Sequence, residues 1–381
     1  MTETPPRKDD RSVLLAAALL AMVLGSVHAF SVFLDPLEQQ LGASRASVSL
    51  TYSFALLCLT AAVLWGHSLY AKTTAARFVL GTSILAALGA IIAAGGGNLT
   101  TIWIGYSLIF GAANGLGYGF GLQIAAQANP SRPGLAMGIV TAAYALGAVA
   151  APPIFATACS AYGFSGAMLI LAAILVITGL NCAMLMSRAK ARFVAPLLRT
   201  QSNAAARLIA HYWLAYGCAV FAGLMAIGHA AGIATALDAN TASWIAPATL
   251  AICNLTGALI GGRLSDFVSP KTLLTALPLL SAVGLASAAL VPSIYLLALG
   301  AIGFAYGAII AIYPAVIAKR FGENGPRLYG RVFTAWGFAG LAGPWLAGAL
   351  FDATGGYRIA LLIAAALAAI SSLAAFRLPN R

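Results

Sequence analysis

Two of the chain's four histidines, His28 and His229, stand inside long apolar runs. A histidine side chain has an ordinary pKa of about 6.5, so it can carry a proton or offset the charge of an anion near neutral pH. When the two apolar runs are overlaid without gaps, His28-Ala29 pairs with His229-Ala230. We therefore predict that both histidines take part in proton coupling and in substrate binding. The alternative is a packing role, in which neighbouring helices satisfy both ring nitrogens.

Other kinds of chemistry find little support in the residue pattern. The stretch N-G-L-G-Y-G-F-G-L-Q, residues 114–123, has a glycine at every second position, but it lacks the third glycine of G-x-G-x-x-G in every register. The five cysteines form no C-x-x-C pair, and no nucleophile-and-base pair or metal-ligand cluster has the spacing that such sites need. We expect no catalytic residue, no metal and no cofactor, and the chain is not predicted to be an enzyme.

The composition indicates which elements must position the histidines. Of the 381 residues, 61% are hydrophobic and 8% are charged, whereas soluble domains average about 25% charged residues. A membrane span needs about 20 apolar residues at a rise of about 1.5 Å each. The sequence predicts an all-α integral membrane protein with twelve transmembrane helices, at approximately 12–34, 47–70, 77–95, 100–126, 135–159, 164–187, 208–236, 243–262, 271–291, 293–318, 328–351 and 357–377.

The basic residues predict the orientation of these spans. If the N-terminus is cytoplasmic, all of the 21 Lys and Arg residues except Arg45 and Arg358 fall at cytoplasmic ends or loops, as the positive-inside rule requires. Both termini are therefore expected in the cytoplasm, with the protein in the plasma (inner) membrane. The net charge of +12 is explained by topology, so no nucleic-acid partner is expected, although a basic inner face can attract anionic membrane lipid.

The chain divides once, at a basic polar stretch with six predicted spans on each side. We predict an N-terminal six-helix bundle at 1–187, a cytoplasmic linker at 188–207 and a C-terminal six-helix bundle at 208–381. With an offset of 192 residues, Gly138 matches Gly330, Pro152 matches Pro344 and Gly163 matches Gly355. Parallel repeats of six helices are typical of transporters that rock one half against the other around a midplane site.

Residues 262–271, G-R-L-S-D-F-V-S-P-K, resemble the cytoplasmic loop motif of the major facilitator superfamily, roughly G-x-L-x-D-R-x-G-R/K. The resemblance implies a gating role for Gly262, Asp266 and Lys271. In the first half the corresponding stretch, G-H-S-L-Y-A-K from Gly66, has Tyr70 in place of the acid. The resemblance implies that this motif helps to hold the cytoplasmic gate closed, and that function is expected to depend mainly on Asp266. The alternative is that this loop only reverses the chain direction between two helices and has no gating role.

Within that superfamily the chain resembles the monocarboxylate porter group, which includes oxalate/formate antiporters. The resemblance is carried by F-S-V-F-L-D-P-L-E-Q-Q-L-G from Phe30, by R-P-G-L-A-M-G from Arg132 and by Y-G-R-V-F-T-A-W-G from Tyr329. The oxalate carriers resemble N-x-x-G-R in the eighth span and T-A-K in the eleventh span. This chain has Ala258 in place of that arginine and Trp336 in place of that lysine, so both cations are missing. A substrate carboxylate would therefore lack the planar arginine partner that the resemblance implies.

The glycines of residues 114–123 gain a physical meaning in a membrane helix, because small residues four apart allow close approach to neighbouring helices. Asn114 and Tyr118 share one face and are expected to look into the pathway, with an inter-helix hydrogen bond from Asn114 as the alternative. The predicted substrate-binding residues are His28, Asn114, Tyr118, Tyr144, His229, Asn254, Tyr306 and Trp336.

These features favour a monomeric secondary active transporter of a small organic solute that works by alternating access. We expect coupling to protons and a monocarboxylate-like substrate; the alternative is a carrier or exporter of a larger, weakly charged or aromatic compound. A solute sensor is disfavoured because no soluble signalling domain is present in the sequence.

Overall fold

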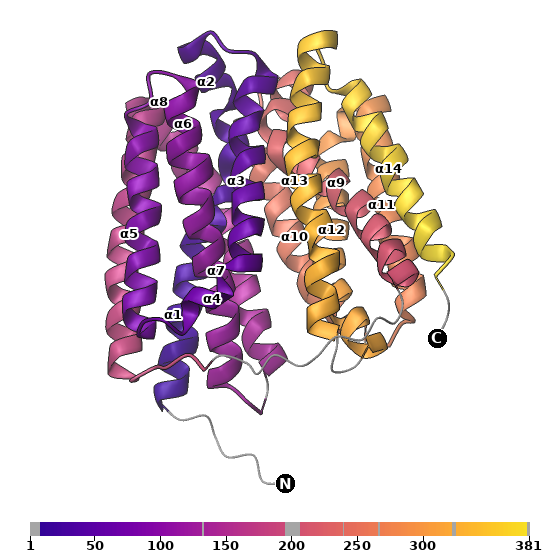
Figure 1. Ribbon diagram of the computed structural model, residues 1–381. Coiled ribbons are helices and arrows are strands. Elements are labelled where there is room, and N and C mark those ends of the chain that lie inside the picture. The colour runs from indigo at the N-terminus through magenta and orange to yellow at the C-terminus, as the bar shows by residue number, and fades with distance from the viewer. Residues whose placement is uncertain are drawn as a thin grey trace. The chain divides into compact units, whose positions relative to one another are not determined.

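The computed structural model describes residues 8–131, 133–194, 206–238, 240–265, 267–321 and 325–378, and within these residues every regular element is a helix (Figure 1). The elements are α1 (Lys8–Leu24), η1 (Gly25–Phe33), α2 (Leu34–Leu41), α3 (Arg45–Trp65), α4 (His67–Tyr70), α5 (Ala75–Ala94), α6 (Leu99–Ile102), η2 (Trp103–Phe110), α7 (Gly111–Ala128), α8 (Pro133–Arg188), α9 (Ala206–Leu237), α10 (Ile245–Leu264), α11 (Pro270–Leu290), η3 (Pro292–Ile294), α12 (Tyr295–Phe321), α13 (Gly325–Thr354) and α14 (Arg358–Phe376). The all-α membrane architecture predicted from the sequence is confirmed.

Ten helical stretches of the described chain are long and apolar enough to cross a membrane. One of them, α8, has 56 residues and is interrupted at Gly163, where φ is 69°. Only glycine adopts this left-handed conformation without strain, so α8 contains two successive helices. The 30-residue α13 lies outside the ten, and the count of twelve spans stays a prediction. Gly355, the predicted repeat partner of Gly163, also has a positive φ of 71°.

The contacts divide the chain into two compact units. Unit 1 comprises Met1–Val27 and Phe54–Thr200, and unit 2 comprises His28–Ser53 and Gln201–Arg381. The predicted bundles at 1–187 and 208–381 differ from these units in one segment, because residues 28–53 group with the second half of the chain. Residues 195–205 of the predicted linker 188–207 lie outside the described residues, and the linker stays a prediction.

Unit 1 is held together by close helix contacts at glycines. In α7, added Cβ atoms at Gly115 and Gly119 would collide with the Leu59 carbonyl and the Tyr70 hydroxyl, whereas one at Gly117 would meet the side chain of Leu24 in α1. The two predicted glycine stripes therefore face two different neighbours, and the predicted close packing is confirmed.

In unit 2, α9 is the central helix and its apolar stretch is almost entirely buried. It contacts α10, α11, α12, α13 and α14, and also α2 from the first part of the chain. Around it α10 lies against α12, and α11 lies against α14 (Figure 1). A central buried helix of this kind can hold polar side chains away from lipid.

Candidate functional site

A polar network of unit 2 surrounds Arg45, the first residue of α3. Its side chain is only 7% exposed. Nε and Nη2 donate to the carboxylate of Glu38, with Nη2 2.8 Å from Oε2, and Nη2 also donates to Asp35. A planar guanidinium that forms paired bonds with a carboxylate is among the stronger and more directional polar contacts in proteins. Arg45 therefore fixes the short helix α2 against the start of α3.

The other side of Arg45 meets residues from the end of the chain. Nη1 donates to the hydroxyl of Tyr357 at 2.8 Å, and the guanidinium carbon lies 4.1 Å from the centre of the Phe351 ring. The cation thus rests on an aromatic face. Gly232 of α9 leaves room for this contact, since a Cβ there would collide with the Tyr357 hydroxyl and crowd Nη1 of Arg45.

A second connection joins α13 to the start of α3. The two carboxylate oxygens of Asp352 accept the backbone N–H groups of Arg45 and Ala46, at 2.9 and 2.8 Å. The first N–H groups of a helix have no intrahelical partner, and the N-terminus carries a partial positive charge. Asp352 satisfies both requirements, so the end of α13 is fastened to the beginning of α3.

His229 lies beneath these groups and is fully buried. Its Nε2 is 2.7 Å from the carbonyl oxygen of Pro344, which can only accept, so Nε2 carries the hydrogen and Nδ1 accepts from the Tyr357 hydroxyl at 2.9 Å. Burial raises the pKa of the Tyr357 hydroxyl above its ordinary value even though Arg45 lies beside it, so this hydroxyl stays a donor. A hydrogen-bonded chain therefore runs from Arg45 through Tyr357 and His229 to Pro344. We call the set Asp35, Glu38, Arg45, His229, Asp352 and Tyr357 the Arg45 network.

His28 occupies a different position in the same unit. It lies in the middle of η1, a 3₁₀ segment of nine residues, and is only partly buried. Its Nδ1 is 2.6 Å from the Tyr52 hydroxyl, and the ring of Tyr52 stacks on Phe30 with the two centres 6.0 Å apart. Runs of 3₁₀ helix this long are uncommon and often mark a functional hinge.

Three predicted residues of unit 1 form one group, in which Asn114 and Tyr144 are buried and Tyr118 is half-buried. Asn114 donates to the Leu24 carbonyl at 2.7 Å and accepts from the Tyr144 hydroxyl at 3.2 Å. The rings of Tyr118 and Tyr144 lie 4.6 Å apart. Leu24 is the last residue of α1 before η1, so the side chain of Asn114 serves a carbonyl where the α-helical hydrogen-bond pattern ends, as a membrane interior requires.

The remaining predicted residues lie on α10, α12 and α13 of unit 2. Trp336 donates from Nε1 to the Tyr306 hydroxyl at 2.8 Å, and its ring stacks on Phe333 with the centres 5.5 Å apart. Asn254 is half-buried on α10, where its backbone lies close to Gly307 of α12. Trp336 and Tyr306 are thus brought together, whereas Asn114, Tyr118 and Tyr144 belong to the other unit.

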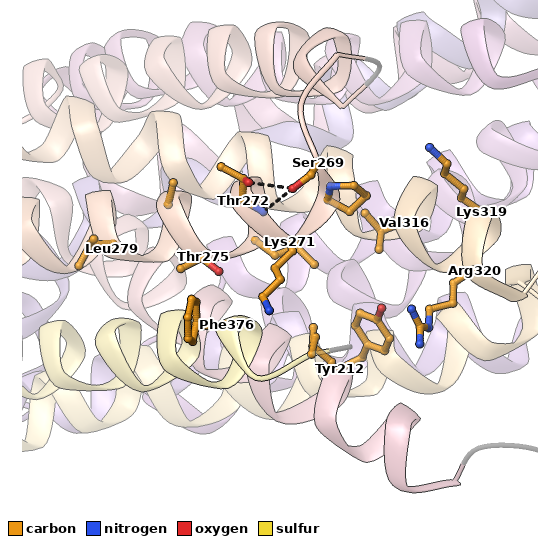
Figure 2. Close-up of a pocket in the computed structure, with 14 residues that line it drawn as sticks. Tyr212, Ser269, Lys271, Thr272, Thr275, Leu279, Val316, Lys319, Arg320 and Phe376 are labelled. Atoms are coloured by element: carbon orange, nitrogen blue, oxygen red, sulfur yellow. Dashed lines mark hydrogen bonds between the residues drawn. The ribbon is translucent and has the colours of Figure 1, made fainter. Parts of the chain in front are cut away.

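The predicted gating motif is only partly visible. Asp266 lies outside the described residues, and Gly262 has open space on its Cβ side. Lys271 is the second residue of α11, and its ammonium lies 4.8 Å from the centre of the Phe376 ring (Figure 2). The gating role of the three residues stays a prediction.

Five residues of the Arg45 network were not predicted from the sequence as candidate site residues: Asp35, Glu38, Arg45, Asp352 and Tyr357. One signal was present, because Arg45 was one of the two basic residues that contradicted the charge asymmetry. A cation that is buried and paired costs little to place away from the cytoplasmic side. Tyr106 of η2 was missed as well, and its hydroxyl donates to the Val27 carbonyl of η1 at 3.4 Å.

Comparison with known proteins finds similarity to membrane transporters. The model of the Major Facilitator Superfamily matches residues 212–381. The uncharacterized MFS-type transporter YhjX of Escherichia coli (strain K12) is 26% identical over 342 residues, which cover 86% of this chain and 85% of that protein.

Solved structures share the fold. A bacterial homolog of the human lysosomal transporter Spinster, in an inward-facing and unoccupied conformation, has a TM-score of 0.76 and 14% identity, with 98% of this chain and 97% of that chain covered. A D-xylose-proton symporter has a TM-score of 0.71 and 16% identity, with 97% and 98% covered. At these identities the likeness concerns the fold alone. The chain therefore has the fold of these solved transporters, and its second half matches the family model of the Major Facilitator Superfamily.

Proposed function

We propose that this protein is a secondary active transporter that moves a small organic solute by alternating access, and that the Arg45 network is the closed form of one of its two gates. The observation that carries the proposal is the double attachment of segment 28–53. Arg45 binds Tyr357 through its side chain, and Asp352 binds the backbone at Arg45 and Ala46. This segment lies between the two parts of unit 1 in the sequence and yet belongs to unit 2.

Such an attachment suits a gate because it is strong when formed and made of separable parts. The carboxylates and the guanidinium can exchange these partners for water when the gate opens. An apolar seal would instead expose apolar surface to water on opening, at a free-energy cost of about 25 cal/mol per Å². The network lies at the ends of the helices that the positive-inside rule puts outside, so we assign it to the outer gate. Both termini are then cytoplasmic, and the plasma (inner) membrane is the proposed location.

This orientation has a direct test. A single reporter cysteine at Gly97, an exposed position with open space around it, should react with an impermeant thiol reagent added outside cells. One at the exposed Lys72 should react only after the membrane is permeabilised. The reverse pattern would place the Arg45 network inside and remove its assignment as the outer gate.

Protons are proposed to couple through the two histidines in different ways. In the closed network both ring nitrogens of His229 are engaged, and a second proton on Nδ1 would meet the same hydroxyl that Arg45 already binds. Protonation of His229 is therefore compatible only with an opened network. The His28 side chain contacts the Tyr52 hydroxyl and is itself partly exposed, which favours it as the group that exchanges protons with the solute pathway.

A monocarboxylate is the proposed substrate class. With Ala258 and Trp336 at the positions that are cationic in oxalate carriers, a dianion would lack two compensating charges, and an unpaired buried charge is costly. A monocarboxylate that enters with one proton is nearly neutral as a pair. Its transport should therefore be stronger at pH 6 than at pH 7.5, since the proton that enters with the acid is more abundant there.

A second candidate is a larger, weakly charged or aromatic compound. The observation that favours it is the aromatic group on α12 and α13, in which Phe333 stacks on Trp336 and Trp336 binds Tyr306. Flat rings stack well on such surfaces.

The deciding experiment uses purified protein in liposomes. Uptake of labelled lactate, of oxalate and of a neutral aromatic compound would be measured at pH 6 and pH 7.5 in the same vesicles. Lactate uptake that rises at pH 6, with little oxalate uptake, supports the proposal, and Ala258→Arg should then raise the uptake of oxalate. Uptake of the aromatic compound alone would favour the second candidate, and tight oxalate exchange by the native chain would contradict the charge argument.

A further inference from the structure

A cavity of about 1000 Å³ opens at the opposite end of unit 2 from the Arg45 network, between α9, α11, α12 and α14 (Figure 2). Three cations line it, namely Lys271 at the start of α11 and Lys319 with Arg320 in the last turn of α12. No Asp or Glu occurs among the described residues that line the cavity. The described side chains at its polar end therefore contribute three positive charges.

The N-terminus of α11 adds to this positive charge. Ser269 caps the helix by accepting the N–H of Thr272 at 3.1 Å, and the aligned peptide dipoles leave a partial positive charge at this end. Charge complementarity thus calls for an anionic group near Lys271.

The lining of the cavity changes character along one face of α11. Lys271, Thr275 and Leu279 are four residues apart, so they share a face, and they lie in that order along the helix in Figure 2. At a rise of about 1.5 Å per residue they are about 6 Å apart along the axis. A cation, a hydroxyl and an apolar side chain therefore follow one another over about 12 Å.

Two details show where a ligand would lie. The Thr275 hydroxyl oxygen is buried and has no hydrogen-bond partner, so it offers an unused donor within the cavity wall. Leu279 is 51% exposed on a membrane helix, so the apolar end of the cavity opens sideways toward lipid and not into a closed core. Phe376 and Val316 continue the apolar wall.

We propose that this cavity binds one anionic phospholipid from the leaflet on its side. The phosphate lies between Lys271 and Arg320 at the start of α11, an ester carbonyl accepts from Thr275, and an acyl chain follows Leu279 into the bilayer. The order phosphate, ester and acyl chain matches the order of side chains along α11. With the orientation proposed above, the ligand comes from the cytoplasmic leaflet, which is rich in anionic lipid.

Binding can be measured on the full-length protein in detergent and does not depend on transport. We would titrate the protein with phosphatidylglycerol, with phosphatidylcholine of the same chains, and with inorganic phosphate, and follow bound lipid by native mass spectrometry and stability by thermal shift. The expected result is preferential binding of phosphatidylglycerol. Lys271→Gln and Arg320→Gln should each weaken this binding about fivefold, since a basic residue near an anionic lipid contributes about 1 kcal/mol.

Matched controls separate the site from general attraction. Arg263→Gln removes an exposed cation at the end of α10 that does not line the cavity, and it should leave the binding unchanged. Thr275→Val should weaken both phospholipids alike, whereas Thr256→Val on α10 should weaken neither. Equal binding of the two phospholipids by the native protein, equal effects of Lys271→Gln and Arg263→Gln, or full replacement of the lipid by inorganic phosphate would each overturn the proposal.

Discussion

Asp352→Asn tests the Arg45 network with the smallest change in shape. The carboxylate accepts two backbone N–H groups at the start of α3, and an amide keeps one acceptor oxygen while its NH2 group opposes the second N–H. The substitution also removes a negative charge from a helix N-terminus. Because Asp352 is exposed to solvent, we expect a loss of about 1–2 kcal/mol rather than the larger cost of a buried pair. This corresponds to a shift of about 5- to 30-fold in the equilibrium between the closed and open network.

The shift can be read as a change in population. If the native network is closed in about 99 of 100 molecules, the variant raises the open fraction to between about 5% and about 25%. Spin labels at the exposed positions Gln40 and Ile359 would report this as a second, longer distance in pulsed electron paramagnetic resonance. Asp238→Asn is the matched control, because its carboxylate accepts hydrogen bonds from its own loop, at Asn240 and Thr241. Indistinguishable distance distributions in native protein and Asp352→Asn would refute the assignment of this contact as a latch.

Three further substitutions probe neighbouring groups. His28→Gln should weaken the response of uptake to an imposed pH gradient more than His67→Gln does, and equal effects would leave His28 as a packing residue. Gly232→Ala should lower the apparent Tm by about 2–6 °C because its methyl group crowds Arg45 and Tyr357, whereas Gly262→Ala has open space and should have little effect. Tyr357→Phe should populate the open network as Asp352→Asn does, since it leaves Nδ1 of His229 without its donor at a cost of about 1–3 kcal/mol. If the effects of Asp352→Asn and Tyr357→Phe on the open fraction add in the double variant, in free-energy terms, the two contacts act independently.

The sequence could group candidate residues that lie close together on one helix, but it could not pair residues that lie far apart in the chain. Asn114 and Tyr118 share a helix face in α7, so local spacing was sufficient to group them, and Tyr144 joins them from a neighbouring helix. The pairing of Trp336 with Tyr306 could not be read from spacing, because the two residues lie 30 positions apart on two different helices. The resemblance to carboxylate carriers drew attention to positions such as Ala258 where an expected charge is missing. The resembling stretch from Phe30 contains Asp35 and Glu38, but the resemblance gave these two acids no role.

The sequence alone determined the helical membrane class, because a lipid interior forces every span to satisfy its own backbone hydrogen bonds and demands long apolar runs. It also determined the paired turns at Gly163 and Gly355, since only glycine adopts that backbone conformation without strain. The tertiary structure decided which polar groups meet. Arg45 and Asp352 are separated by 307 residues, and no local rule relates them. Their contact arises because segment 28–53 folds against the second half of the chain, where a buried cation and a free helix N-terminus each require an acid.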